Sequence, residues 1–176
     1  MSRKPLYIVD SNVLIQAHRS YYSFDVCPGF WRGLCVHCGG KRIASIDKVL
    51  KEVENGANDA LKEWATTTVP EEFFKRTEDR QVIKKFAEMV TWVQSSDHFT
   101  DPAKAHFANI ADGWLVAYAA CNDCVVVTLE AENSRTTSKI PIPNLCEEFS
   151  VKCANTFQMM RELKMKLALS TKRIRK

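Results

Sequence analysis

The stretch LYIVDSNVLI, residues 6–15, places an apolar run directly before three polar side chains. Residues 6–9 are β-branched, aliphatic or aromatic without polar alternation, which predicts a short buried strand. Asp10 then stands at the carboxyl end of that strand. Because an unpaired buried charge is costly, Asp10 needs a helix N-terminus, a cationic side chain or a metal ion as its partner.

A second apolar run, CVVVTLE at residues 124–130, also ends on a carboxylate, that of Glu130. Helical periodicity fills the sequence between the two runs. After the first strand, Asn12 is the expected N-cap of a short helix. In SIDKVLKEVENG, Ser45 or Asp47 is expected to cap an amphipathic helix that includes Ile46. Two buried strands interleaved with helices predict an α/β domain with a mainly parallel sheet.

Further helices are expected on both sides of these segments. Pro28 suits the first turn of a helix that the Gly39-Gly40 pair ends, and Asn155 is the expected cap of a C-terminal helix. Apolar periodicity predicts the remaining helices over residues 58–65, 78–96 and 110–122.

Composition limits the class of protein. The chain has 176 residues, 45% of them hydrophobic, which suits one domain with its own core. No apolar run approaches the roughly 20 residues that span a bilayer, and the N-terminus lacks a secretory h-region. The seven cysteines are odd in number and sit mostly in apolar segments, which favours reduced thiols. A soluble cytoplasmic protein is therefore expected.

Charge is distributed unevenly along the chain. The net charge is +4, but residues 164–176 hold six basic and no acidic residues, which leaves 19 basic against 21 acidic residues elsewhere. We therefore expect a domain over residues 1–163 and a basic tail over residues 164–176. Such a tail suits a phosphate-rich ligand, although a solvated terminus has the same composition.

Three acids occupy comparable places in the predicted fold. Asp10 and Glu130 follow the two strands, and ligands of parallel α/β sheets gather at the carboxyl ends of strands. Asp112 is a lone charge in the apolar segment IADGWLVAYA. Each acid could instead cap a helix or belong to an ordinary polar loop. Converging carboxylates without a Lys or Arg partner would repel one another, and Mg²⁺ or Mn²⁺ relieves that repulsion.

The motifs YIVDSNVLI, SIDKVLKEVENG, ADGWLVAYA and VVVTLE, in this order, resemble those of the PIN-domain nucleases, especially the VapC-like toxins. The resemblance covers residues 6–132, and the later IPIPNLC is similar to a divergent PIN subfamily found in toxin–antitoxin modules. It implies a three-layer sandwich with a mainly parallel central sheet flanked by helices.

The resemblance also implies a set of site residues. The acids that match the family pattern would act as catalytic metal ligands: Asp10, Glu52, Asp112 and Glu130. Glu130 falls where many members have Asp or Asn, and the helical wheel leaves Glu54 as an alternative to Glu52. Three further residues would hold ligands or water around the metal: Ser11, Asn12 and Thr128.

The implied activity is hydrolysis of RNA phosphodiester bonds by an Mg²⁺- or Mn²⁺-dependent endoribonuclease, the toxin of a toxin–antitoxin pair. Its implied partners are RNA, a cognate antitoxin protein and, as an option, a second copy of the chain. One alternative is a catalytically weak PIN-like module that binds nucleic acid or a protein. Another is a phosphatase of the haloacid-dehalogenase type, which requires a second Asp where this chain has Asn12.

Two other features suggest chemistry less strongly. A structural zinc could use Cys27, Cys35, His37 and Cys38, but buried or idle thiols are the favoured interpretation of the CVHC and CNDC pairs. The aromatic residues Tyr21, Tyr22, Phe30 and Trp31 could stack on bases, but core packing is the better prediction.

Overall fold

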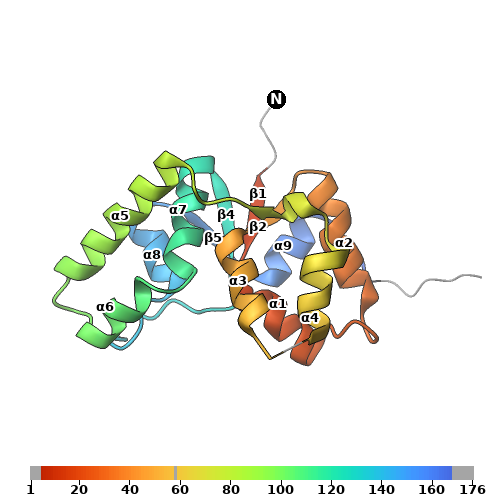
Figure 1. Ribbon diagram of the computed structural model, residues 1–176, viewed down its shortest axis with the longest axis horizontal. Coiled ribbons are helices and arrows are strands. Elements are labelled where there is room, and N and C mark those ends of the chain that lie inside the picture. Colours follow the sequence, from red (N-terminus) through yellow and green to blue (C-terminus); the bar gives the residue numbers. More distant parts are fainter. Residues whose placement is uncertain (1–4, 58, 168–176) are drawn as a thin grey trace, which may run out of the picture.

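Five short parallel strands form the centre of the protein. The computed structural model describes residues 5–57 and 59–167, and the strands lie in the order β3-β2-β1-β4-β5 (Figure 1). Every neighbouring pair is parallel. The strands are β1 (Leu6–Val9), β2 (Ile43–Ile46), β3 (Phe74–Lys75), β4 (Cys124–Val127) and β5 (Lys152–Ala154). The prediction of an α/β fold with a parallel central sheet is confirmed.

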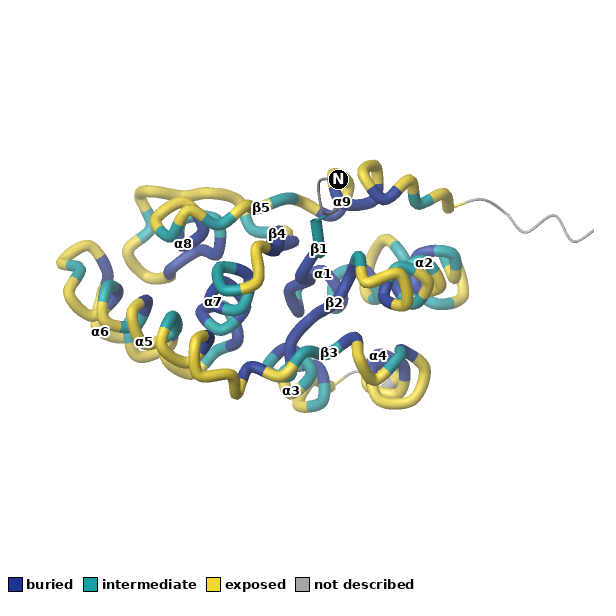
Figure 2. Tube along the Cα trace, turned by 90° about the horizontal axis from the view of Figure 1, so that it is seen from above, coloured by how far each residue is buried: buried dark blue, intermediate teal, exposed yellow. Residues whose placement is uncertain are grey.

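Helices cover both faces of the sheet, which gives three layers (Figures 1 and 2). One face carries α5 (Arg80–Ser95), α6 (Asp101–Phe107), α7 (Asp112–Asn122) and α8 (Ile142–Glu148). The other carries α2 (Pro28–Gly39), α4 (Asp59–Glu63) and α9 (Thr156–Glu162). The short helix α1 (Ser11–Gln16) packs against α3 (Asp47–Asn55). Shorter helical turns are Ala17–Tyr21 and Trp64–Thr68, both π-helical, and the 3₁₀ turn Glu71–Phe73.

The central strands are buried because helices cover them on both sides. All four residues of β2 and of β4 are buried, as are the last three of β1. This continuous burial explains why their sequences do not alternate between apolar and polar residues. The Tyr7 hydroxyl donates a hydrogen bond to the Glu162 carboxylate, which fastens α9 to β1. Phe30 and Trp31 are buried as predicted, whereas Tyr21 is 69% exposed and contradicts the core assignment.

The sequence pattern does not predict strand β2, because the last residues of this strand also fit the start of the following helix. Ser45 does not cap that helix; it is buried in β2 and donates from its hydroxyl to the Val9 carbonyl, 2.6 Å away. Ile46 is also in the strand, and α3 begins at Asp47 without a side-chain cap. The Asp47 carboxylate instead accepts a hydrogen bond from the Thr77 hydroxyl at 2.8 Å. A four-residue strand lacks a distinctive sequence period, so its pairing with β1 decides its conformation.

Most helix predictions hold, with one wrong cap. Helix α2 runs from Pro28 to Gly39 as expected, and Asn155 caps α9 in a capping box with Gln158. The prediction that Asn12 caps α1 is wrong. Asp10 holds the N-cap position, without a side-chain capping hydrogen bond, and the Asn12 side chain bonds elsewhere.

The predicted boundary at residue 163 lies within a packed segment. Met165 is partly buried, and its side chain covers Gly33 of α2. Residues 168–176, which make up most of the predicted basic tail, lie outside the described residues. None of the described helices is both long and apolar enough to cross a membrane.

Strand order determines where a ligand would bind. The chain leaves β1 toward β2 on one side of the sheet, while β4 flanks β1 on the other side. In such sheets the crevice opens at the carboxyl ends of the two strands where the order reverses, here β1 and β4. The Asp10 N–H donates to the Val127 carbonyl at 2.9 Å, so the ends of these strands are held together.

Candidate carboxylate site

Asp10 is a buried carboxylate at the carboxyl end of β1, with only 2% of the residue exposed. Its Oδ2 accepts a hydrogen bond from the Thr128 hydroxyl at 3.0 Å. Burial raises the pKa of Asp10 to about 6, and the charges of Glu130 and Glu52 act in the same direction. The hydrogen bond from Thr128 opposes that rise because it stabilises the ionised form. The local structure therefore holds Asp10 in place without neutralising its charge.

Asp112 is the first residue of α7. Burial raises the pKa of Asp112 to about 8, and the carboxylates of Asp10, Glu130 and Glu52 add to the rise. No described residue donates a hydrogen bond to its carboxylate. Since α7 leads directly into β4, its first residue lies at the edge of the sheet where β4 ends. The Asp112 carboxylate therefore lies near other carboxylates, and a bound cation would relieve the repulsion between their charges.

Glu52 reaches the same site from α3. Its Oε1 accepts a hydrogen bond from the backbone N–H of Ala111 at 2.9 Å, and its charge acts on both Asp10 and Asp112. For Glu54, by contrast, no side-chain hydrogen bond to another described residue is seen, and its backbone carbonyl accepts from the Lys62 ammonium at 3.2 Å. Of the two glutamates that the helical wheel left open, the structure brings Glu52 to the other acids.

Glu130 lies in the segment after β4, with 15% of its side chain exposed. One carboxylate oxygen bonds the Lys139 ammonium, and the other accepts from the Ile142 N–H at 2.8 Å. Its charge acts on Asp10 and Asp112, so it belongs to the same electrostatic cluster. Lys139 was not predicted, because an isolated lysine before IPIP gives no sequence signal.

Asn12 and Thr128 connect the two sides of the crevice. The Asn12 amide donates to the Thr128 hydroxyl at 3.0 Å and accepts from the Leu129 N–H at 3.1 Å. The Thr128 hydroxyl also accepts from the Glu130 N–H at 3.2 Å. Ser11 lies 3.5 Å from the Asp10 carboxylate. These hydrogen bonds tie the segments that follow β1 and β4 to each other around Asp10.

The donor set suits a hard cation, since it consists of carboxylate oxygens. Within residues 5–57 and 59–167, however, no three His, Cys, Asp or Glu side chains are gathered as a metal-binding group. The physical reason lies in the contacts above: two of the four acids are turned toward other partners, Glu52 to a backbone N–H and Glu130 to Lys139. The donor chemistry fits Mg²⁺ or Mn²⁺. The carboxylates would have to move closer together to bind one ion.

The zinc alternative receives no support from the described residues. Cys27, Cys35, His37 and Cys38 all lie in the described part of the chain, and they form no such group. All seven cysteines lie in the described part of the chain, and none of them forms a disulfide bond. Burial raises the pKa of both Cys35 and Cys38, which favours the thiol over the metal-binding thiolate.

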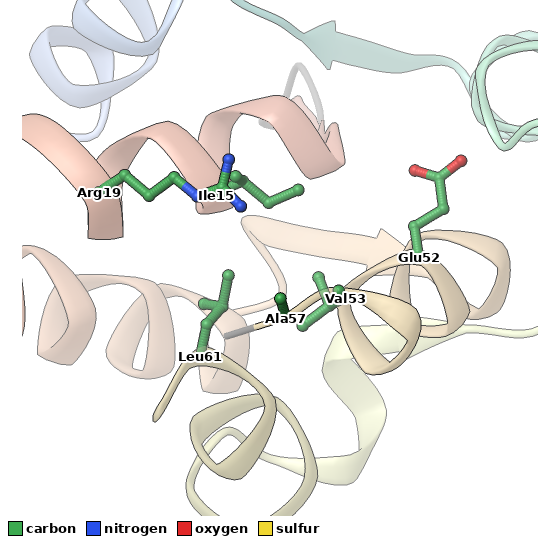
Figure 3. A pocket seen from close by; sticks show the side chains of 7 residues that line it. Ile15, Arg19, Glu52, Val53, Ala57 and Leu61 are labelled. Carbon is green, nitrogen blue, oxygen red and sulfur yellow. The ribbon is translucent and has the colours of Figure 1, made fainter. Parts of the chain in front are cut away.

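A small pocket of about 20 Å³ lies beside α1 and α3, and Glu52 is one of the residues that line it. In Figure 3 the Glu52 carboxylate points away from Leu61, while the Arg19 side chain runs alongside Ile15. The lining is otherwise apolar, with Val53, Gly56 and Ala57 completing it. The pocket is therefore lined by one cationic side chain, that of Arg19, and by the acidic side chain of Glu52.

Comparison with known proteins places the chain in a family. No curated protein matches the sequence. A solved structure described as "Crystal Structure of FitAcB from Neisseria gonorrhoeae" is similar over 86% of this chain and 99% of that chain, with a TM-score of 0.48 and 15% sequence identity. The model of a family described as a domain of unknown function, DUF4411, matches residues 7–167. Because that match spans most of the sequence, the chain belongs to the DUF4411 family.

Proposed function

We propose that this protein is a metal-dependent endoribonuclease that hydrolyses RNA phosphodiester bonds at the carboxylate site. One observation carries the proposal. Asp10 and Asp112, from different parts of the sequence, are electrostatically coupled at the carboxyl ends of β1 and β4, and their pKa values are raised chiefly by burial. Such clustering of acids with raised pKa values at a topological switch point is typical of functional sites.

The residues have distinct roles in this proposal. Asp10, Glu52 and Asp112, with Glu130 beside them, would hold Mg²⁺ or Mn²⁺, which supplies an activated water and neutralises charge on the phosphate. Thr128 orients Asp10 through its hydroxyl, and Asn12 in turn holds Thr128. Arg19, which lines the adjoining pocket, would attract the nucleic-acid backbone.

We further propose that the ribonuclease is the toxin of a toxin–antitoxin pair, with a small antitoxin protein as its partner. The ordered motifs that resemble VapC-like toxins support this assignment, and the described cysteines, which form no disulfide bond, suit a reducing cytoplasm. The basic tail would strengthen RNA binding in a salt-dependent way, and assembly as a homodimer is part of the same proposal.

The deciding experiment measures cleavage of a mixed panel of structured and single-stranded RNAs, with Mn²⁺, with Mg²⁺ and with EDTA. Asp10→Asn and Asp112→Asn should abolish cleavage while the circular dichroism spectrum keeps its wild-type form. The exposed Asp97→Asn variant is the matched control and should cleave normally. Full cleavage in EDTA, or by both site variants, would contradict the proposal.

Two further results would separate the proposal from its alternative. Expression of the wild-type protein should arrest bacterial growth, and Asp10→Asn should relieve the arrest. RNA binding that is independent of metal, without cleavage of any RNA, would favour the catalytically weak binding module instead.

A further inference from the structure

The side chain of Lys139 places a cation among the acids. Its ammonium group bonds the Glu130 carboxylate, and burial, which lowers the pKa of Lys139, is outweighed by the carboxylates of Glu130, Asp112 and Asp10, which raise it. Three of the four candidate metal ligands therefore act on this one lysine. Among the described lysines, the others that pair with a carboxylate, Lys48 and Lys85, do so with Asp47 and Glu88 instead.

The segment that carries Lys139 is fixed at several points. The Thr137 carbonyl accepts from the Thr100 N–H at 2.9 Å, and the Thr136 carbonyl lies 2.9 Å from the His98 Nε2. On the other side, Ile140 is buried in the core and begins the turn into α8. The backbone is therefore anchored on both sides of Lys139, whose side chain is 49% exposed and whose ammonium bonds Glu130.

Both carboxylate oxygens of Glu130 already accept a hydrogen bond. One oxygen bonds Lys139 and the other accepts from the Ile142 N–H. A divalent cation bound to Glu130 would have to displace the ammonium or lie next to it. Either arrangement is unfavourable, since it breaks a charge-assisted hydrogen bond or places two positive charges together.

We propose that Lys139 takes the position of a second cation, so that the carboxylate site binds one divalent metal ion, on Asp10, Glu52 and Asp112. Glu130 then acts as a positioning residue that holds Lys139, and it is not a metal ligand. The Lys139 ammonium faces the same acids as the metal and supplies the second positive charge next to the scissile phosphate. This inference rests on the proposed metal-dependent activity.

The test is the stoichiometry and affinity of Mn²⁺ binding to the full-length protein, measured by titration calorimetry and by electron paramagnetic resonance of free Mn²⁺. The wild type should bind one Mn²⁺ ion. Lys139→Met should bind two, with the second ion at least about tenfold tighter than any second binding to the wild type. Lys139→Arg, which keeps the charge, and Lys85→Met, which removes a lysine paired with Glu88, should both bind one.

The outcomes separate the inference from the function on which it rests. Two Mn²⁺ ions on the wild type, or a single ion on a folded Lys139→Met protein, would overturn the role of Lys139 and leave the nuclease proposal intact. Absence of Mn²⁺ binding by the wild type would overturn both. Thermal unfolding of each variant without metal establishes that it is folded before the titration.

Discussion

The carboxylate of Glu52 accepts a hydrogen bond from the backbone N–H of Ala111 at 2.9 Å. This contact joins α3 to the residue before Asp112, although Glu52 and Ala111 lie 59 positions apart in the sequence. Glu52, a candidate metal ligand, thus also holds the start of α7 in place. Its two roles can be separated by substitution, because an amide oxygen accepts a hydrogen bond but carries no charge.

Glu52→Gln should keep the stability of the wild type while losing Mn²⁺ affinity by at least about tenfold, because the amide oxygen still accepts from Ala111. Glu52→Ala should lose the same affinity and, in addition, about 1 kcal/mol of unfolding free energy. Urea unfolding and Mn²⁺ titration measure the two effects. Glu54→Gln is the matched control on the same helix, and an equal loss of affinity there would contradict the assignment of Glu52.

Thr128→Val should destabilise the protein by about 1–3 kcal/mol, since it leaves the Asn12 amide and the Glu130 N–H without their common acceptor. It also removes the donor to Asp10, so Mn²⁺ affinity should fall by roughly 10–100-fold. Thr128→Ser keeps the hydroxyl and should stay close to wild type in both measurements. A Thr128→Val protein that binds Mn²⁺ normally would show that the hydroxyl does not orient Asp10.

Asp112 should make the metal-free protein less stable as the pH rises. Its pKa of about 8 in the folded protein lies above its ordinary value of 3.8, so the folded state holds the proton more tightly than the unfolded state. The resulting stabilisation is present below pH 3.8 and is lost as the pH rises through 8. Asp112→Asn, which carries no charge, should therefore gain in melting temperature over the wild type by roughly 5 °C between pH 5 and pH 8.5.

The measurement is thermal unfolding in EDTA across that pH range, with Asp97→Asn as the exposed control. A melting-temperature difference between Asp112→Asn and wild type that stays constant with pH would refute the raised pKa.

Gly113→Ala should destabilise the protein by about 1–3 kcal/mol, because a Cβ there would lie 2.7 Å from the Phe107 ring and 2.8 Å from the Phe86 ring. The displaced rings would also shift the start of α7 and weaken Mn²⁺ binding at Asp112. Gly39→Ala is the matched control, since no atom lies within 4 Å of its added Cβ and its unfolding free energy should change little or rise. Chemical denaturation compares the two variants, and equal stability would contradict the close packing at Gly113.

Much of the candidate site was predictable because its acids lie directly next to segments with a clear hydrophobic pattern. The unbroken apolar run before Asp10 and the apolar helix after Asp112 leave each carboxylate as a local exception to its surroundings, which is visible without a structure. The short strands β3 and β5 were not predictable, because two or three residues carry no period and pair only where the sheet provides a neighbour.

The sequence by itself determined the parallel α/β class and the positions of Asp10, Asp112 and Glu130, because hydrophobic periodicity and buried runs are local properties of the chain. Only the tertiary structure decided which partners these acids have. Glu52 meets Ala111, Thr128 meets Asp10, and Lys139 meets Glu130 through contacts that depend on strand order and loop anchoring. A single lysine in a loop belongs to no hydrophobic or charge pattern in the sequence. The fold alone brings Lys139 next to the Glu130 carboxylate.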